Sequence, residues 1–376
     1  MSEKPNTPVY VTRPYLPPLE EFIPYLEQMW ATRQLTNGGP FHDQFERALE
    51  VYLGVKHVSL FANGTLALLT ALKALHVSGE VITTPYSFVA TAHSLLWNDI
   101  TPVFVDIDRQ TMGIAPEKIE AAITERTTAI LPVHVYGYPC DVRKIRAIAD
   151  RHDLRVIFDA AHAFGVRDEG GSLLRHGNLS VVSFHATKVF TTFEGGAIIS
   201  PNAEIKRRID SLKNFGFLNE ISVTELGING KMNEVQAAMG LVQLKHIDAA
   251  IEQRRAADQT YRRLLAGVRG VHCPVPPAGI RHHNYSYFPI LIGREYSISR
   301  DQLFNELRQH NIFARRYFYP LISNFRMYKS ADDRKERFPV AADVASRVLC
   351  LPIFPGIDEA TLALISELIA KHGGTS

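Results

Sequence analysis

Short apolar runs alternate with segments of helical spacing through much of the chain, and this alternation limits the fold more than any other feature. Runs rich in β-branched and aromatic residues, which indicate strands, fall at 57–61, 80–84, 102–107, 129–135, 155–159, 181–185 and 197–200. Helical patterns lie between several of them, at 65–75 and 142–151. Strands that alternate with helices form βαβ units around a mainly parallel sheet, so we predict an α/β fold.

The pattern changes after about residue 240. A long amphipathic helix is predicted over 235–265 and a strand over 286–292. Helices are also predicted over 301–310 and 358–371, each with an aspartate suited to its N-terminal end. We therefore predict a large α/β domain over residues 1–250 and a smaller α+β domain over residues 251–376.

Composition excludes several classes of protein. The three cysteines, Cys140, Cys273 and Cys350, contain no CxxC pair, which disfavours a disulfide framework and predicts a cytoplasmic protein. Lys and Arg total 41 and Asp and Glu total 39, and this balance argues against nucleic-acid binding by a basic face. No segment has the apolar length of a membrane span, and the histidines show no metal-ligand spacing, so we expect neither a membrane nor a metal partner.

The glycines exclude two common nucleotide sites. No two are spaced as G-x-G, and the only Gly-Lys pair, Gly230-Lys231, is followed by Met232. A Rossmann fingerprint and a P-loop are therefore both missing, so any bound phosphate must be held in another way.

One candidate phosphate site lies in residues 61–68 (FANGTLAL), where a predicted strand ends and a helix begins. The N–H groups at that helix start, around Gly64, together with the Thr65 hydroxyl, would form an anion site. The alternative is a plain turn in which Asn63 or Thr65 caps the helix.

Two further segments carry ionisable groups at predicted strand ends. Residues 156–162 (VIFDAAH) deliver Asp159 and His162, and residues 183–188 (SFHATK) deliver Lys188. A partly desolvated lysine has a lowered pKa and can form a Schiff base. Each residue also has an ordinary alternative: Asp159 as a helix cap, His162 as a structural histidine and Lys188 as an exposed loop lysine.

Taken together, a phosphate site, a carboxylate and a lysine in this order fit pyridoxal phosphate. That cofactor needs a phosphate cradle, a carboxylate at its ring nitrogen and a lysine for its aldehyde. Phe88 could stack on the ring, although an ordinary core phenylalanine is the simpler interpretation of this residue.

At this point the chain resembles the DegT-type sugar aminotransferases, which are fold-type-I pyridoxal phosphate enzymes. The resemblance covers nearly the whole chain. Its motifs are 35–40 (LTNGGP), 63–65 (NGT), 132–137 (PVHVYG), 159–162 (DAAH), 183–188 (SFHATK), 194–196 (EGG) and 227–232 (GINGKM). The stretches 185–190 and 227–234 look most like one branch, the VioA-type dTDP-4-amino-4,6-dideoxyglucose transaminases.

The resemblance implies a role for each candidate residue. Lys188 would be the catalytic lysine, Asp159 would bind the ring nitrogen, and Phe88 and His162 would lie against the ring. Gly64, Thr65 and Ser183 would hold the phosphate. Asn229 would reach the phosphate of the partner subunit, which implies a homodimer with shared sites. Phe193, Lys231 and His162 stand where many members of the family have Gly, Arg and Gln.

The implied reaction moves the amino group of L-glutamate to the 4-keto group of dTDP-4-keto-6-deoxy-D-glucose, a step that fits O-antigen biosynthesis. Arg315 could meet the diphosphate of the sugar nucleotide, as could Arg316, and a solvated basic loop is the alternative. A 3-keto sugar aminotransferase and a non-catalytic sensor on the same fold remain open. A 3-dehydratase of the family is disfavoured, because such relatives have a histidine where Lys188 stands.

Overall fold

A computed structural model describes residue 5 and residues 7–329 and 337–373. Its largest element is a seven-stranded sheet with strand order β2-β10-β9-β6-β5-β3-β4. Only β10 runs antiparallel to its neighbours, and the other pairs are parallel. The strands are β2 (His57–Phe61), β3 (Glu80–Thr83), β4 (Thr101–Phe104), β5 (Thr127–Leu131), β6 (Arg155–Asp159), β9 (Leu179–Ser183) and β10 (Gly196–Ser200).

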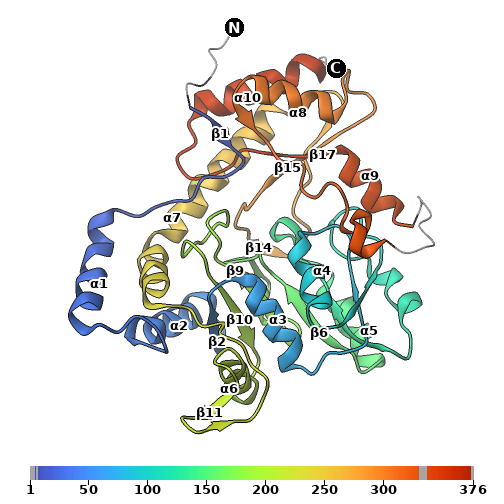
Figure 1. The fold of residues 1–376 in the computed structure, drawn as a ribbon. Helices are drawn as coiled ribbons and strands as arrows, with labels where there is room; N and C mark the ends of the chain where they lie inside the picture. The colour runs from blue at the N-terminus through green and yellow to red at the C-terminus, as the bar shows by residue number, and fades with distance from the viewer. Residues whose placement is uncertain (1–4, 6, 330–336, 374–376) are drawn as a thin grey trace.

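Helices cover both faces of this sheet (Figure 1). On one face lie α3 (Gly64–Ala74), α4 (Val89–Leu96) and α6 (Ala203–Leu212), which share a core with alternate residues of the strands. On the other lie α2 (Pro40–Leu53), α5 (Val142–Arg151) and the first half of α7 (Glu234–Leu264). In β6, for example, Ile157 packs on the first face while Val156 and Phe158 pack on the second. Two-sided burial explains why these strands read as continuous apolar runs.

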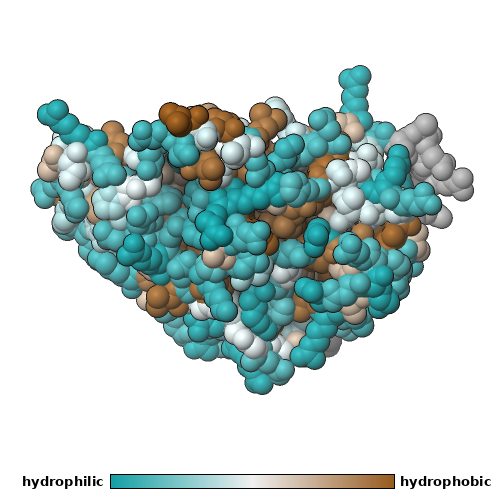
Figure 2. All heavy atoms as spheres, turned by 90° about the horizontal axis from the view of Figure 1, so that it is seen from below, coloured by the Kyte–Doolittle hydropathy of each residue, from teal (hydrophilic) through white to brown (hydrophobic). Residues whose placement is uncertain are grey.

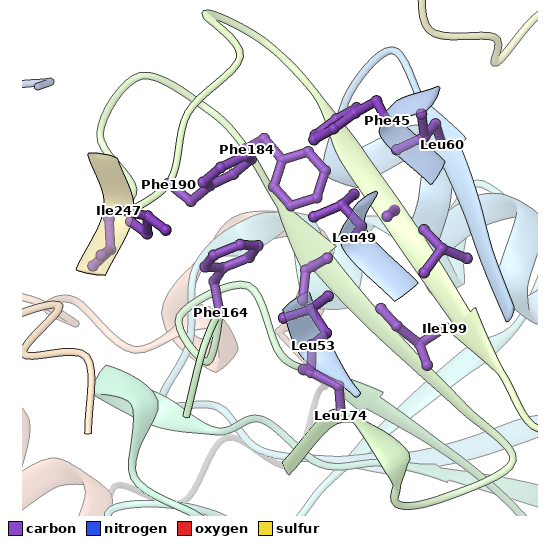
Figure 3. Packing of buried hydrophobic residues seen from close by; sticks show 14 of the residues in the cluster. Phe45, Leu49, Leu53, Leu60, Phe164, Leu174, Phe184, Phe190, Ile199 and Ile247 are labelled. Atoms are coloured by element: carbon purple, nitrogen blue, oxygen red, sulfur yellow. The ribbon is translucent and has the colours of Figure 1, made fainter. Parts of the chain in front are cut away.

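Aromatic rings fill the core beneath α2 and α7 (Figure 3). Phe164 stacks on Phe190 with ring centroids 4.3 Å apart, and Phe45 lies parallel to Phe190 at 6.0 Å. Phe184 meets Phe190 edge-on at 5.2 Å. Because Phe184 and Phe190 flank Lys188 in the chain, this packing anchors both ends of the loop that carries the lysine.

The C-terminal part has its own sheet, β13-β15-β17, and its own core. It comprises β13 (Val271–His272), β15 (Phe288–Ile292), α8 (Arg300–Gln309), β16 (Ile312–Phe313), α9 (Pro339–Arg347), β17 (Val348–Leu351) and α10 (Glu359–Gly373). Near the N-terminus, β1 (Val9–Tyr10) pairs in parallel with β16, so Val9 belongs to this core. In Figure 1 this part lies above the large sheet, and α7 runs from one to the other.

The other elements of the described residues are one helix of 14 residues and several short pieces. They are α1 (Leu19–Thr32), β7 (Arg167–Asp168), β8 (Gly171–Ser172), β11 (Phe217–Asn219), β12 (Ser222–Val223) and β14 (Ile280–His282), with six single turns of 3₁₀-helix at Pro116–Lys118, Glu120–Ala122, Val135–Gly137, Leu173–Arg175, Ile322–Asn324 and Arg326–Tyr328. Over the described ranges, no helix is long and apolar enough to cross a membrane.

The predicted fold class is confirmed, and several predicted elements coincide with observed ones. The predictions at 57–61, 142–151 and 155–159 match β2, α5 and β6 residue for residue. The strand predicted at 181–185 instead ends at Ser183, so the residues from His185 to Lys188 form a turn beyond it. A domain boundary at residue 250 stays a prediction. That position falls inside α7, which is continuous from residue 234 to 264.

Candidate active site

A cavity of about 360 Å³ opens beside the carboxyl ends of β6 and β9, the edge where ligands usually bind in such sheets. Nearly all of the candidate residues line it. They are Gly64, Thr65, Phe88, Asp159, His162, Ser183, Lys188 and Arg315. Asn229 does not line it, and the site therefore unites eight of the nine candidates within one chain.

The N-terminus of α3 forms one wall of the cavity. Asn63 caps this helix, because its side-chain oxygen accepts the N–H of Leu66 at 2.9 Å. The N–H groups of Gly64 and Thr65 precede any intrahelical partner and can meet an anion. A Cβ on Gly64 would lie 3.0 Å from Ser183 Cβ, so glycine lets the helix start approach the Ser183 side chain closely. Capping by Asn63 and the anion site thus coexist.

Asp159 lies at the end of β6 and is buried. Its Oδ2 accepts the Thr91 hydroxyl at 2.7 Å, and its Oδ1 accepts the N–H of Ala161 at 3.1 Å. Burial raises the pKa of this carboxyl above its ordinary value, while the two hydrogen bonds and Lys188 oppose the rise. A buried carboxylate in this position favours a cationic N–H partner from the cavity side.

His162 lies close by on the loop after β6. The N–H of Tyr136 donates to His162 Nδ1 at 3.2 Å, so the neutral ring carries its proton on Nε2. Burial, reinforced by Lys188, lowers the pKa of His162 well below its ordinary value. The imidazole therefore presents a neutral, flat face to the cavity at neutral pH.

Lys188 follows β9 in the turn held by the hydrogen bond from its own N–H to the carbonyl of His185, at 2.8 Å. Burial lowers the pKa of its ammonium group to about 8, and the attraction of Asp159 limits the fall. The neutral amine is thus a much larger fraction at neutral pH than for an ordinary lysine, although the ammonium form still predominates, and the neutral form is the one that a nucleophilic lysine uses.

Phe88 precedes α4 at its N-cap position and is 57% exposed. The simpler interpretation of this residue, an ordinary core phenylalanine, is therefore wrong. An exposed ring at the cavity wall is available to stack on a flat ligand.

The two neighbouring arginines differ. Arg316 donates to Asp301 at 2.8 Å and lies over the Phe304 ring, outside the cavity lining. Arg315 is exposed and lines the cavity, and it forms no ion pair with any residue that the structure describes. Among the described residues, Arg315 is thus a cavity-lining cation without an ion-pair partner.

The structure adds cavity residues that the sequence analysis does not identify. Tyr317 and Phe318 reach the cavity on the same segment as Arg315, and Tyr287 does so from the residue before β15. Thr91 stands behind Asp159, and its hydroxyl is 2.7 Å from that of Ser87. Their positions depend on contacts between distant segments, so no local sequence signal marks them.

Asn229 does not line this cavity. It is exposed and forms an isolated β-bridge with Asn214. The neighbouring β11–β12 hairpin and the loop after it expose large apolar side chains, namely Leu218 (70%), Ile221 (94%) and Leu226 (82%). Figure 2 views the molecule from below, the side where β11 lies in Figure 1, and shows apolar residues on this face.

Comparison with known proteins gives the family. The family model described as the DegT/DnrJ/EryC1/StrS aminotransferase family matches residues 19–370. The chain belongs to this family. It is thus an aminotransferase, and the family predicted from the motifs is confirmed.

Individual relatives are similar over almost their whole length. A relative from Shigella dysenteriae, named dTDP-4-amino-4,6-dideoxy-D-glucose transaminase, is 54% identical over 364 residues, covering 97% of this chain and 99% of that one. The crystal structure of DesI with its TDP-sugar product matches with a TM-score of 0.93 and 34% identity, covering 98% and 94%. NtdA from Bacillus subtilis, with bound cofactor PMP, matches with a TM-score of 0.85 and 29% identity, covering 94% and 82%.

The residues present fit pyridoxal phosphate, and the predicted cofactor is confirmed by the family and its structures. For the phosphate, the cavity has the N-terminus of α3 beside the Ser183 side chain. For the ring nitrogen it has the buried carboxylate of Asp159, and for the aldehyde it has Lys188, whose pKa is lowered. A site for pyridoxal phosphate needs these three features.

Proposed function

We propose that this pyridoxal-phosphate-dependent aminotransferase moves the amino group of L-glutamate to the 4-keto group of dTDP-4-keto-6-deoxy-D-glucose. The products are dTDP-4-amino-4,6-dideoxy-D-glucose and 2-oxoglutarate. The observation that carries the proposal is Lys188, of lowered pKa, facing the same cavity as the buried Asp159. The similarity to the Shigella dysenteriae transaminase supports the choice of sugar.

Bound pyridoxal phosphate supplies an aldehyde that exchanges amino groups and a ring that accepts electrons from the reacting carbon. Lys188 Nζ is the base and acid in our scheme. It takes the proton from the α-carbon of glutamate, and it later returns a proton to C4 of the sugar. Its pKa of about 8 lets both directions proceed near neutral pH.

Asp159 keeps the ring nitrogen protonated in this scheme, because its carboxylate is buried and oriented by Thr91 and Ala161. Phe88 would stack on the ring, and the neutral His162 would lie against it. Gly64, Thr65 and Ser183 hold the phosphate through N–H and hydroxyl donors. All six of these residues line the cavity, which supports the assignments.

Arg315 recognises the diphosphate of the sugar nucleotide. In such a substrate the diphosphate is attached at C1, across the sugar ring from C4. When C4 reaches Lys188, the diphosphate therefore lies toward the open side of the cavity, where Arg315 is exposed. A guanidinium matches phosphate oxygens with two parallel hydrogen bonds.

The active unit in this proposal is a homodimer in the cytoplasm. Asn229 is exposed beside Leu226 and lies outside its own chain's cavity, as expected of a residue that reaches a partner's phosphate. Exposed apolar side chains on the β11–β12 hairpin support an interface at this face. Subunit mass at micromolar concentration, measured by sedimentation, tests the dimer.

The function is tested by incubating the holoenzyme with glutamate and dTDP-4-keto-6-deoxy-D-glucose, followed by NMR analysis of the product. An equatorial amine at C4 is expected, together with one 2-oxoglutarate per amine, whereas an axial amine would give the galactose-configured epimer and contradict the proposed product. An amine at C3 would establish the 3-keto alternative, and no amine from any keto sugar would favour a sensor. Lys188→Ala is the matched negative control, because it should retain the fold and lose all turnover.

A further inference from the structure

Two buried tyrosines converge on one backbone carbonyl beneath the active site. The hydroxyls of Tyr86 and Tyr136 are 2.6 Å apart, and both contact the carbonyl of Tyr317, that of Tyr86 at 2.9 Å. Both side chains are fully buried, and burial raises the pKa of each phenol well above its ordinary value. Both hydroxyls therefore keep their single protons, so one donates to the carbonyl while the other donates across the 2.6 Å contact, and either can be the donor to the carbonyl.

This carbonyl belongs to the segment that brings Arg315 and Phe318 to the cavity. The segment is joined to β17 by paired hydrogen bonds between the backbones of Arg315 and Cys350, at 3.0 and 2.7 Å. It is joined to the large sheet's side by the N–H of Ile322, which donates to the carbonyl of Pro85 at 3.0 Å. Between these two attachment points, the hydroxyls of Tyr86 and Tyr136 contact the backbone carbonyl of Tyr317 and hold it in place.

Tyr136 also reaches His162 on the cofactor side. Its N–H is the donor to His162 Nδ1, and its ring lies parallel to that of Phe318, with centroids 6.2 Å apart. Phe318 in turn lies parallel to His162 at 5.9 Å. Tyr136 holds a left-handed backbone conformation, with φ of 58°, which is uncommon for a residue with a side chain. Such conformations concentrate at functional sites.

We infer that Tyr86 and Tyr136 are positioning residues for the acceptor sugar, acting through the Tyr317 carbonyl. This inference rests on the proposed function. The two tyrosines hold the segment carrying Arg315 and Tyr317 in the conformation that binds the nucleotide sugar. Glutamate is small and reacts at the buried end of the cavity beside Lys188. Its half-reaction does not need the open end where Arg315 lies.

The test is the pair Tyr86→Phe and Tyr136→Phe, measured singly and together on the holoenzyme. Each single variant leaves the other hydroxyl on the carbonyl and so only weakens the hold, whereas the double variant frees the carbonyl. We expect the double variant to raise KM for dTDP-4-keto-6-deoxy-D-glucose at least tenfold. The rate of the glutamate half-reaction, followed by cofactor absorbance in a single turnover, is expected to stay within twofold of the wild type.

Tyr261→Phe is the matched control. Its hydroxyl is also buried and donates to a backbone carbonyl, that of Pro352 at 2.9 Å, but in the C-terminal core. It should change neither quantity. If the double variant does not take up cofactor, Tyr86→Phe is expected to show a smaller rise in the same KM.

Two results would overturn the inference: an unchanged KM for the sugar, or a glutamate half-reaction that slows in proportion. The second would mean that the hydroxyls support the whole site rather than the sugar segment. A wild-type enzyme that does not aminate this sugar overturns the proposed function, and the inference with it. The wild-type reaction run in parallel therefore tells the two failures apart.

Discussion

Replacing Asp159 by asparagine isolates the role of one buried charge. The two side chains have the same shape, and the asparagine oxygen can still accept the N–H of Ala161. The new amide faces Thr91, whose hydroxyl can accept instead of donate. Only the negative charge is lost, so an effect on the reaction reports that charge.

The magnitude follows from burial. Asp159 is 5% exposed, and losing one group that stabilises the charge developing in a transition state costs about 2.7–4 kcal/mol. At about 1.4 kcal/mol per tenfold in rate, kcat should fall about 10²- to 10³-fold. Lys188 should respond as well. The attraction of Asp159 raises its pKa, so without that charge the pKa falls below the wild-type value of about 8.

The stability of the Asp159→Asn apoenzyme should not fall along with its rate. Because the folded state raises the pKa of Asp159, it binds the proton more tightly than the unfolded chain does. Stability of the wild-type apoenzyme therefore falls as pH rises through the interval between the two pKa values, and the cost persists above it. Asparagine carries no such cost, so the variant apoenzyme should be at least as stable as the wild type at pH 7.

Steady-state kinetics of the holoenzyme check the predicted fall in kcat, and urea unfolding of the apoenzyme checks the predicted stability. Asp106→Asn is the control for kcat alone: Asp106 is also a buried carboxylate but lies outside the cavity lining, so kcat should hold, although stability should fall because both of its oxygens accept backbone N–H groups and the new amide would face one of them. The reasoning is refuted if Asp159→Asn keeps kcat within tenfold. It is also refuted if the variant apoenzyme loses stability, because the loss of rate would then report misfolding.

Other predictions follow from single contacts. The rate at which the apoenzyme captures pyridoxal phosphate should rise with pH and level off above a midpoint near 8, because only neutral Lys188 reacts; a midpoint near 10 would contradict the burial argument. Gly64→Ala should weaken cofactor binding about tenfold in an absorbance titration, because the new Cβ would crowd Ser183 at 3.0 Å; unchanged affinity would show that the cradle lies elsewhere. Arg315→Gln should raise KM for the sugar nucleotide about 10- to 100-fold, the worth of a charged hydrogen bond, whereas Arg316→Gln, already paired with Asp301, should change it less than about threefold. Equal effects of the two substitutions would refute the assignment of Arg315.

Much of the site could be predicted because local sequence determines where strands end. Asp159 ends an apolar strand, and Lys188 follows another, so both had to lie at one edge of a parallel sheet. The glycine at position 64 signalled the helix start beside them. Motif resemblance then supplied roles that spacing alone leaves open.

The rest depends on tertiary contacts. Phe88 reads as a core residue by composition, but it is exposed because its place at the N-cap of α4 turns it toward the cavity. Tyr317 and Phe318 reach the site only because a segment more than 100 residues after Lys188 docks on Tyr86 and Tyr136. No local pattern contains that information, and the same holds for the two distant carboxylate–helix contacts of Asp106.

The pairing of β1 with β16 has a consequence for how the molecule is made. During synthesis Val9 leaves the ribosome about 300 residues before its partner Ile312. The part of the C-terminal core that contains Val9 is completed only when that late strand meets the earliest one, and contacts so far apart in sequence form slowly. Until then the newly made α/β sheet can assemble from its own nearby strands while β1 waits unpaired. Deleting the first dozen residues should therefore impair a late step of folding. The part of the molecule affected would be the C-terminal part, which carries Arg315.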